Sequence, residues 1–290
     1  RANLMGTPEL NIGWKQPPRT RHDPLPAAIT QAASQQTFHV IGALVDRGRS
    51  PQAFRAYAYF RWVDDWIDET LRTRADRLAF VARQRAIVSA AYAGQPLPEP
   101  TVEEQMAVDL IAADCDGHGG LRLYFEHLLA VMAFDAERRG RLISAQELDE
   151  YTRHLAIGVT EALHYFIGHD DPSPPIETRY LAVTGAHITH MLRDTCEDVA
   201  AGYFNVPYEF LAAQGIGPGD VHADAYRDWV ESRVRLARAC FAAGRGYLAQ
   251  VRNGRCRLAG YSYCEQFERV LDGLEASAYR LRFDKQNERI

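Results

Sequence analysis

The stretch YAYFRWVDDWIDE, residues 57–69, carries the pattern that decides the fold. Its polar residues follow one another at spacings of four, three and four: Tyr57, Arg61, Asp64 and Asp68. This spacing places them on one face of an α-helix. Bulky apolar residues fill the positions between them, so little of the helix is left to face open water. The pattern predicts a polar stripe facing an enclosed space; a solvated acidic helix face is the alternative.

Around this stretch, most of the chain has the pattern of helix. From residue 27 onward, long segments carry apolar residues at spacings of three and four and are rich in good helix formers. Gly and Pro cluster between them, and no linker is long enough to separate two cores. We therefore predict an all-α, single-domain helical bundle at residues 26–290, preceded by a mobile N-terminal arm at residues 1–25. The expected helices cover residues 27–46, 52–71, 74–93, 102–114, 121–140, 145–167, 176–201, 223–252 and 256–282.

The composition is that of a globular protein. Of 290 residues, 47% are hydrophobic and 24% are charged, and the formal net charge is −5. This charge provides no basic field for a nucleic-acid backbone, so we expect no nucleic-acid partner. No apolar run reaches the roughly 18 to 20 residues that a membrane span needs. Five cysteines without a C-x-x-C pair favour a reducing, cytoplasmic location.

A second acidic pattern occurs in THMLRDTCEDVAAGYFNVP, residues 189–207. Asp194 and Asp198 are again four residues apart, and Arg193 stands beside them as Arg61 does in the first pattern. Two carboxylates about 5 Å apart repel each other by roughly 3 kcal/mol at an effective dielectric of about 20, so a cluster of four needs cations. Mg²⁺ prefers a few carboxylates completed by water and phosphate oxygens, whereas Zn²⁺ favours His and Cys. The two patterns predict a Mg²⁺ site for a phosphorylated ligand, with both arginines on phosphate oxygens.

Both acidic segments resemble the squalene/phytoene synthase family, whose two helical D-x-x-x-D motifs face each other across an all-α bundle. Between them, MAFDAERRGRLISAQELDEYTRHLA, residues 132–156, resembles the family's methionine-to-aspartate segment and its tyrosine-bearing helix. SQQTF, residues 34–38, lies where the family has a Ser and a Phe near the diphosphate. The resemblance covers residues 34–282 and implies the isoprenoid synthase fold with a central cavity.

The resemblance also implies an activity. A Mg²⁺-dependent prenyltransferase would condense two C15 or C20 prenyl diphosphates head to head, releasing diphosphate and forming a squalene-, presqualene- or phytoene-like product. The residues implied in binding two or three Mg²⁺ ions are Asp64, Asp68, Asp194 and Asp198. The residues implied in binding the diphosphate are Ser34, Phe38, Arg61 and Arg193. Tyr151 matches a family tyrosine that lines the site, which implies a role in stabilising the cation or the leaving group.

The chain departs from the family at residues that would influence how the prenyl cation, formed when diphosphate leaves, goes on to react. The family carries Gln and Asn seven and four residues before the first aspartate of the second motif, and His187 and His190 replace them. Both stay on the stripe of Asp194 and are expected to be polar groups of the cavity, as is Tyr57. The imidazoles would act as a base, bind diphosphate or ligate metal. The alternative is that each is an ordinary core histidine whose nitrogens are hydrogen-bonded within the protein.

A further departure follows the second motif. Tyr203 and Asn205 replace the arginine and tyrosine of the family's G-R-x-Y-L-P pattern, while Gly202 and Pro207 remain. One cation is thereby lost from the expected surroundings of the diphosphate.

Three functions stay open on these residues. The first is head-to-head condensation of two prenyl diphosphates. The second is ionisation of a single prenyl or presqualene diphosphate followed by cyclisation or water capture, which the two histidines motivate. The third is a non-catalytic helical relative that serves in assembly or binding. No motif bears on NADPH, chain length or oligomeric state, and a hydrophobic product would suit transient contact with a membrane surface.

Overall fold

The computed structural model describes residues 25–114, 119–169 and 173–281, and every regular element in these ranges is helical. The helices are α1 (Leu25–Ala33), α2 (Gln35–Leu44), α3 (Ser50–Asp65), α4 (Arg74–Ala93), α5 (Val102–Ala112), α6 (Gly120–Arg138), α7 (Ala145–Phe166), α8 (Leu181–Arg193), α9 (Thr195–Ala201), α10 (Tyr208–Gln214), α11 (Asp224–Leu248) and α12 (Gly254–Ala276). A π-helical turn, η1 (Trp66–Thr70), continues α3, and a 3-10 turn, η2 (Glu177–Tyr180), leads into α8. The all-α prediction is confirmed. Residues 1–24 of the expected arm lie outside the described residues.

Two of the expected helices are divided. The segment expected at residues 27–46 forms α1 and α2, which meet at Ser34. The segment expected at residues 176–201 is interrupted at Asp194, whose φ of −94° and ψ of 8° lie outside the helical region. Ser and Asp are poor residues for a helix interior, because their short polar side chains stabilise non-helical backbone. Apolar periodicity continues across such a point, so the pattern alone joins the two helices.

One short helix has no counterpart among the expected ones. α10 begins directly after Pro207 and ends at Gly215, whose φ of +63° closes it in the left-handed region. Its seven residues are too few to show an apolar periodicity. The sequence pattern therefore left residues 202–222 without a helix.

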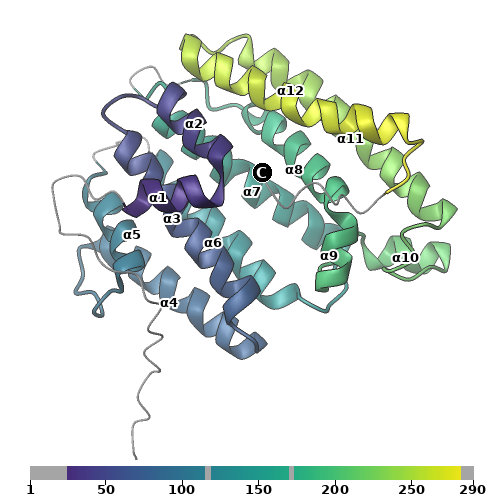
Figure 1. Cartoon of the computed structure of the whole chain (residues 1–290), viewed down its shortest axis with the longest axis horizontal. Coiled ribbons are helices and arrows are strands. Elements are labelled where there is room, and N and C mark those ends of the chain that lie inside the picture. The colour runs from purple at the N-terminus through teal and green to yellow at the C-terminus, as the bar shows by residue number, and fades with distance from the viewer. Residues whose placement is uncertain (1–24, 115–118, 170–172, 282–290) are drawn as a thin grey trace, which may run out of the picture.

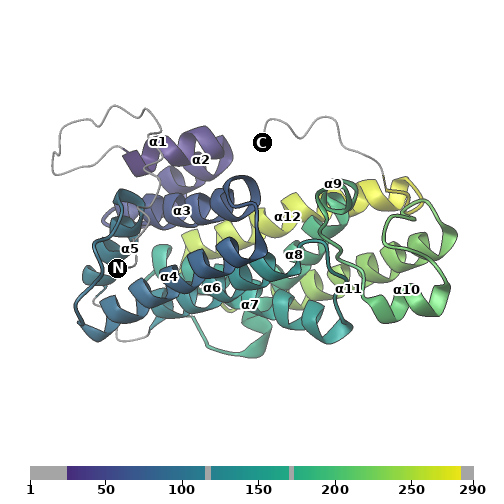
Figure 2. The ribbon, with the colours of Figure 1, turned by 90° about the horizontal axis from the view of Figure 1, so that it is seen from below.

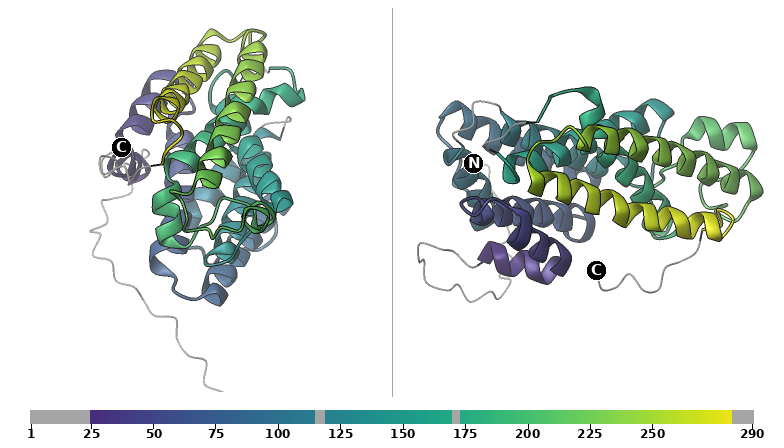
Figure 3. Two further views of the ribbon diagram at one scale, coloured as in Figure 1. Left: turned by 90° about the vertical axis from the view of Figure 1, so that its right-hand side faces the viewer. Right: turned by 90° about the horizontal axis from the view of Figure 1, so that it is seen from above.

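The helices are arranged around α6 and α7, the most extensive helix pair in the described chain. α3, α4 and α5 lie on the α6 side, whereas α8, α11 and α12 lie on the α7 side (Figure 1). α1 and α2 form a separate short layer over α3, and α11 and α12 run side by side along one edge (Figures 2 and 3). None of the described helices is both long and apolar enough to cross a lipid bilayer.

An aromatic cluster fixes the orientation of α3. Tyr59 and Phe60 pack against Phe125 on α6, and the ring centroids of Phe60 and Tyr124 are 4.8 Å apart. A fully buried ring contributes about 1.5–3 kcal/mol. The Tyr59 hydroxyl donates to Gln84 Oε1 on α4 at 3.0 Å, which satisfies its polar atom. Since the polar stripe of α3 lies roughly 100° around the helix from this buried face, it borders the core rather than the outer surface.

α8 and α11 approach each other through small residues. A Cβ added at Gly244 on α11 would lie 2.7 Å from the backbone nitrogen of Ala182 on α8. A Cβ added at Gly185 on α8 would lie 3.1 Å from the carbonyl oxygen of Ala237 on α11. Interiors are packed as densely as organic crystals, so these backbones have no room for added atoms. The contact fixes α8, which carries the start of the second acidic motif.

We expect Gly244→Ala to lower the free energy of unfolding by about 1–3 kcal/mol, because the added methyl group forces α8 and α11 apart. Urea denaturation followed by circular dichroism measures this change. Gly246→Ala is the matched control on the same helix, since a Cβ there meets no described atom within 4 Å. It should be neutral or stabilising by up to about 1 kcal/mol. Equal stability of the two variants would contradict the close approach.

Candidate functional site

The two acidic motifs lie at neighbouring helix ends. The first occupies the end of α3 and η1, and the second spans the junction of α8 and α9. Burial raises the pKa of Asp64 and of Asp198, and the charge of Asp135, near the end of α6, raises both further. Tyr203, which follows the second motif, donates to Asp68 Oδ1 of the first at 2.6 Å. The structure therefore brings the two motifs together around the end of α6.

Within the first motif, Asp64 is the carboxylate whose charged form its surroundings disfavour. Burial raises its pKa to about 7, the charge of Asp68 acts in the same direction, and Arg61 opposes the shift. Arg61 Nη1 lies 3.5 Å from Asp64 Oδ2, and Arg61 Nη2 also pairs with Asp65. The side chains of Arg61 and Asp64 are each 40% exposed. Arg61 therefore lies at the rim of the cluster, where it neutralises part of the acidic charge.

The two aspartates of the second motif have opposite environments. Burial alone would raise the pKa of Asp194, but hydrogen bonds from Arg193 and His190 hold it well below its usual range. Arg193 Nε and Nη2 donate to the two carboxylate oxygens at 2.6 and 2.9 Å, and His190 Nε2 lies 2.9 Å from Oδ2. For Asp198, burial and then the charge of Asp194 raise the pKa to about 7. Asp194 is thus already neutralised by protein groups, whereas Asp198 is not.

A buried arginine links the motifs. Arg138, at the end of α6, donates from Nε to Asp135 Oδ1 and from Nη1 to Asn205 Oδ1, both at 2.7 Å. Its guanidinium carbon lies 4.8 Å from the ring centroid of Tyr151 and 5.0 Å from that of Tyr203. The Tyr151 hydroxyl donates to Asp135 Oδ2 at 3.1 Å, so the ring that the resemblance implies in the site has a fixed orientation. Arg138 is a cation held between aromatic faces at the centre of the site.

The sequence prediction gave no role to Asp135 and Arg138. Both lie in the segment compared with the family, and their spacing of three at a helix end allows an ion pair. That acid–arginine pair is the signal that would have found them. Because Arg139 and Arg141 follow so closely, the sequence alone does not show which arginine is buried.

The two histidines of the second stripe differ in depth. His187 is only 5% exposed, its ring centroid lies 5.0 Å from that of Tyr151, and its buried Nε2 has no hydrogen-bond partner among the described residues. Burial, assisted by the positive charges of His190 and Arg138, lowers the pKa of His187 to about 3. His190 keeps 52% of its side chain exposed beside Asp194. His187 therefore lies one helical turn further into the protein as a neutral imidazole.

The remaining predicted residues lie near α3. Tyr57 is partly buried against the core. Burial lowers the pKa of the Arg61 guanidinium, Asp65 and then Asp64 raise it, and the Tyr57 hydroxyl adds the smallest contribution in the same direction. Ser34 lies at the junction of α1 and α2, and its backbone N–H donates to the Thr30 carbonyl at 2.8 Å. The side chain of Phe38 lies outside the described residues.

The carboxylates fit a divalent cation that is not fully enclosed by protein. In the described part of the chain, no three His, Cys, Asp or Glu side chains are gathered into a set that could hold a metal ion. Asp64 and Asp198 nevertheless have a raised pKa, because burial and a neighbouring carboxylate disfavour their charge. A nearby cation removes this penalty. Mg²⁺ usually takes one or two carboxylates and completes its shell with water and phosphate oxygens, which suits this arrangement.

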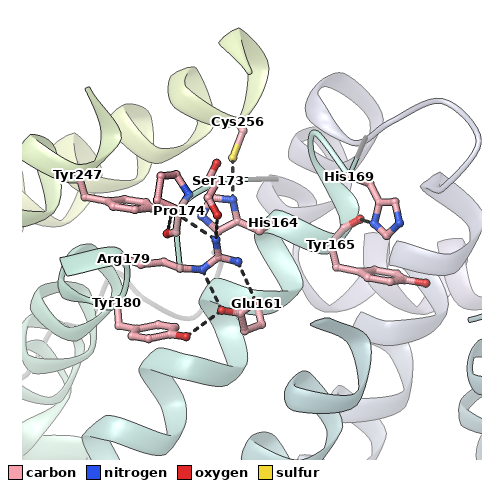
Figure 4. Close-up of polar contacts among 10 residues, drawn as sticks. All are labelled: Glu161, His164, Tyr165, His169, Ser173, Pro174, Arg179, Tyr180, Tyr247 and Cys256. Carbon is pink, nitrogen blue, oxygen red and sulfur yellow. Dashed lines mark hydrogen bonds and ion pairs between the residues drawn. The ribbon is translucent and has the colours of Figure 1, made fainter. Parts of the chain in front are cut away.

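A cavity of about 620 Å³ lies elsewhere, around Glu161 and Arg179 (Figure 4). Glu161 is ten residues beyond Tyr151 on α7, or about 15 Å along the helix. Arg179 Nε and Nη2 donate to Glu161 at 2.9 and 2.8 Å, and the Tyr180 hydroxyl donates to the same carboxylate at 3.0 Å. This cavity is lined by polar groups that satisfy one another, so we do not place the chemistry there.

A thiol and an imidazole also meet beside this cavity. His164 Nδ1 lies 3.4 Å from Cys256 Sγ (Figure 4). Burial, and then the charge of Arg179, lowers the pKa of His164 to about 3, while burial raises the pKa of Cys256 to about 11. Both groups are therefore neutral near pH 7. The pair lacks the thiolate that a cysteine nucleophile needs.

The metal-free protein should lose stability as the pH rises through about 7. The carboxyls of Asp64 and Asp198 have their pKa raised from 3.8 to about 7, so the folded state binds protons more tightly than the unfolded chain. Their stabilisation is complete below the unfolded pKa and is lost as the pH rises through the folded pKa. We expect Asp198→Asn to melt at a higher temperature than the unmodified protein at pH 8 in EDTA, with a smaller difference at pH 5. Differential scanning calorimetry measures both.

Asp65→Asn is the control for this experiment. Because Asp65 is paired with Arg61, removing its charge should not raise the melting temperature. No gain at pH 8 for Asp198→Asn would contradict the crowding of negative charge at the site.

Comparison with known proteins identifies the family. The squalene/phytoene synthase family model matches residues 31–289, which confirms the resemblance of the chain to this family. A presqualene diphosphate synthase of Rhodopseudomonas palustris is 27% identical over 198 residues, covering 68% of this chain and 67% of the relative. A bifunctional lycopene cyclase/phytoene synthase of Aspergillus oryzae is 24% identical over 230 residues, covering 71% of this chain but 38% of that protein.

Solved structures share the fold. The squalene synthase HpnC from Alicyclobacillus acidocaldarius superposes with a TM-score of 0.69 at 20% identity, covering 89% of this chain and 94% of that one. A dehydrosqualene synthase in complex with ligand gives a TM-score of 0.68 at 16% identity, covering 91% and 89%. Fold, motifs and family model agree, and the chain belongs to the squalene/phytoene synthase family of prenyltransferases.

Proposed function

We propose that the chain uses Mg²⁺ to ionise a prenyl diphosphate and joins the resulting allylic cation head to head to a second prenyl diphosphate. The observation that carries this proposal is the pair of facing acidic motifs, in which Asp64 and Asp198 both have a pKa raised to about 7. Such crowded carboxylates disfavour their own charge and favour a cation between them. The names of the two curated relatives, for presqualene diphosphate and phytoene synthesis, support a product of this class.

The motif aspartates would hold the metal from two sides. Asp64 and Asp68 belong to the first helix end, and Asp198, with its pKa raised, belongs to the second. Asp194 would contribute only by giving up part of its contact with Arg193 and His190. Bound Mg²⁺ supplies charge stabilisation for the departing diphosphate and a template that orients it.

The arginines would bind the leaving group directly. Arg138 is buried and remains charged: burial lowers its pKa, but Asp135, Tyr151 and Asp198 together outweigh that effect and raise the pKa above its usual value. Arg61 and Arg193 lie at the rim, each already on a motif carboxylate. A positive charge fixed in a site that excludes water stabilises developing negative charge without reorganisation.

The surroundings of Tyr151 would receive the cation. Its hydroxyl donates to Asp135, and the Phe134 ring lies beside it, tilted by 39°, with a centroid distance of 5.1 Å. Aromatic faces attract cations through their quadrupole. This region lies inward of the acidic rim. The first carbon of a prenyl chain would reach it when the diphosphate of that chain is held at the rim.

The proposal is tested by product analysis with purified protein. We expect diphosphate release from C15 and C20 prenyl diphosphates that requires Mg²⁺, together with a coupled product identified by mass spectrometry. Asp64→Asn should reduce the rate by about 100-fold or more, comparable to the loss of one preorganised charge-stabilising group. Asp109→Asn, at an exposed position of α5, is the matched control and should retain the rate. Release that is independent of Mg²⁺ would contradict the proposal, and no release at all would favour the non-catalytic relative.

A second candidate function is capture of the cation by water. The observation that favours it is His187 Nε2, which is buried beside Tyr151 without a partner among the described residues. In this reaction the diphosphate leaves with the electron pair of the C–O bond and a water oxygen bonds to the carbon. The water's proton then passes to the neutral imidazole, and the product is an alcohol.

His187→Gln distinguishes the two functions, because it restores the amide that the family carries at this position. If water capture operates, the unmodified protein forms an alcohol that incorporates ¹⁸O from labelled water, and His187→Gln loses most of it while still releasing diphosphate. His222→Gln, at an exposed loop position, should leave the product unchanged. An alcohol yield unaffected by His187→Gln, or no alcohol from the unmodified protein, would rule out this role.

A further inference from the structure

The connection between α9 and α10, residues 202–207, contacts both acidic motifs. We call it the strap. Tyr203 donates from its hydroxyl to Asp68 Oδ1 at 2.6 Å. Two residues later, Asn205 donates from Nδ2 to Asp198 Oδ2 at 2.7 Å. One short segment therefore holds one carboxylate from each side of the site.

The strap is fixed at both ends to the loop between α6 and α7. The Gly140 N–H donates to the Gly202 carbonyl at 2.7 Å, and the Tyr208 N–H donates to the Ile143 carbonyl at 2.8 Å. Gly202 has a φ of +87°, a conformation that favours glycine. Backbone bonds at each end mean that the strap has a defined position between the motifs before any ligand binds.

Arg139 connects the first motif to the end of α9, the helix from which the strap continues. It donates from Nη1 to the Asp68 carbonyl at 3.0 Å and from Nε to the Ala201 carbonyl at 3.2 Å. The backbone of Asp68 is thus held by the same arginine that holds the end of α9. The strap and the first motif form one connected unit.

The amide of Asn205 has a defined direction. Its oxygen accepts from Arg138 Nη1 at 2.7 Å, and its nitrogen donates to Asp198 Oδ2. A cation on one side and a carboxylate on the other leave only this orientation. Tyr203 is similarly enclosed, since its ring lies 5.0 Å from the Arg138 guanidinium and both strap residues are 8% exposed.

These contacts have a consequence for a metal ion. Each donor occupies one oxygen of its carboxylate and fixes the rotation of the group, so the other oxygen has a set direction. Hydrogen bonds of this kind orient metal-binding carboxylates, and their loss typically weakens metal binding by about 10- to 100-fold. A hydroxyl and an amide do this without placing a positive charge beside the cation.

We propose that Tyr203 and Asn205 are positioning residues that orient Asp68 and Asp198 for Mg²⁺. They stand where the family has arginine and tyrosine, so this chain orients its aspartates with a different pair of side chains. The inference rests on the proposed function, because it assumes that these two aspartates bind the metal.

The test is Mg²⁺ titration of the full chain by calorimetry in saturating inorganic pyrophosphate. We expect Tyr203→Phe, which removes only the hydroxyl, to raise the Mg²⁺ dissociation constant by about 10-fold or more. Asn205→Ala should do the same and serves as the second variant if Tyr203→Phe does not fold. Tyr208→Phe is the matched control, because this tyrosine directly follows the strap and is 48% exposed. Its dissociation constant should equal that of the unmodified protein.

The outcomes separate the two proposals. A purely structural role would lower the melting temperature of Tyr203→Phe in EDTA while leaving the Mg²⁺ dissociation constant unchanged, and this result would overturn the inference. Tighter Mg²⁺ binding by Tyr203→Phe would also overturn it, because the hydroxyl would then compete with the metal. If the unmodified protein takes up no Mg²⁺ with pyrophosphate, the proposed function fails together with the strap.

Discussion

Repulsion between carboxylates is the constraint on which the rest of the site depends. Two helix ends place Asp64, Asp68 and Asp198 around the partly buried Asp135, with Asp194 close to Asp198. Burial raises the cost of the charge on Asp64, Asp135, Asp194 and Asp198. The protein relieves this cost in a different way for each group. Arg193 and His190 neutralise Asp194, whereas burial raises the pKa of Asp64 and of Asp198 to about 7. Burial also raises the pKa of Asp135, and its ion pair with Arg138 opposes this rise. The arginines and His190 therefore leave negative charge unbalanced in both motifs. A divalent ion bound together with a diphosphate would neutralise this charge.

The packing of the helices holds the two helix ends together against this repulsion. Aromatic packing of α3 on α6 orients the first motif, and the seam between α8 and α11 fixes the helix that leads into the second. The strap, the loop between α6 and α7 and Arg138 then connect the motifs through directional hydrogen bonds. Hydrophobic contacts set the approximate distance between the motifs, and polar contacts set the direction of individual oxygens.

The sequence was sufficient for the parts of this arrangement that depend on periodicity. Spacings of three and four predicted the helices and both acidic stripes, because such spacing follows directly from helix geometry. The sequence was insufficient where tertiary contacts determine which side chain is buried or where a helix ends. His187 and His190 share a stripe in the sequence, yet packing against Tyr151 buries one and leaves the other half exposed. Arg138 lies in an arginine-rich helix end, and only the packed structure shows which of these cations is internal. The interruption at Asp194 depends likewise on local backbone that an apolar pattern does not record.

The close contact between α8 and α11 at Gly185 and Gly244 bears on which positions of this scaffold tolerate substitution. Since Gly185 and Gly244 leave no free space between these backbones, a larger residue at either position would displace the helix that leads into the second motif. The contact between α3 and α6, in contrast, is built from large aromatic rings, and truncating one of them would leave a cavity and loosen the packing that orients the first motif. Both contacts therefore belong to the fixed frame of the site, one because it has no space for added atoms and the other because its large rings fill the space between the helices.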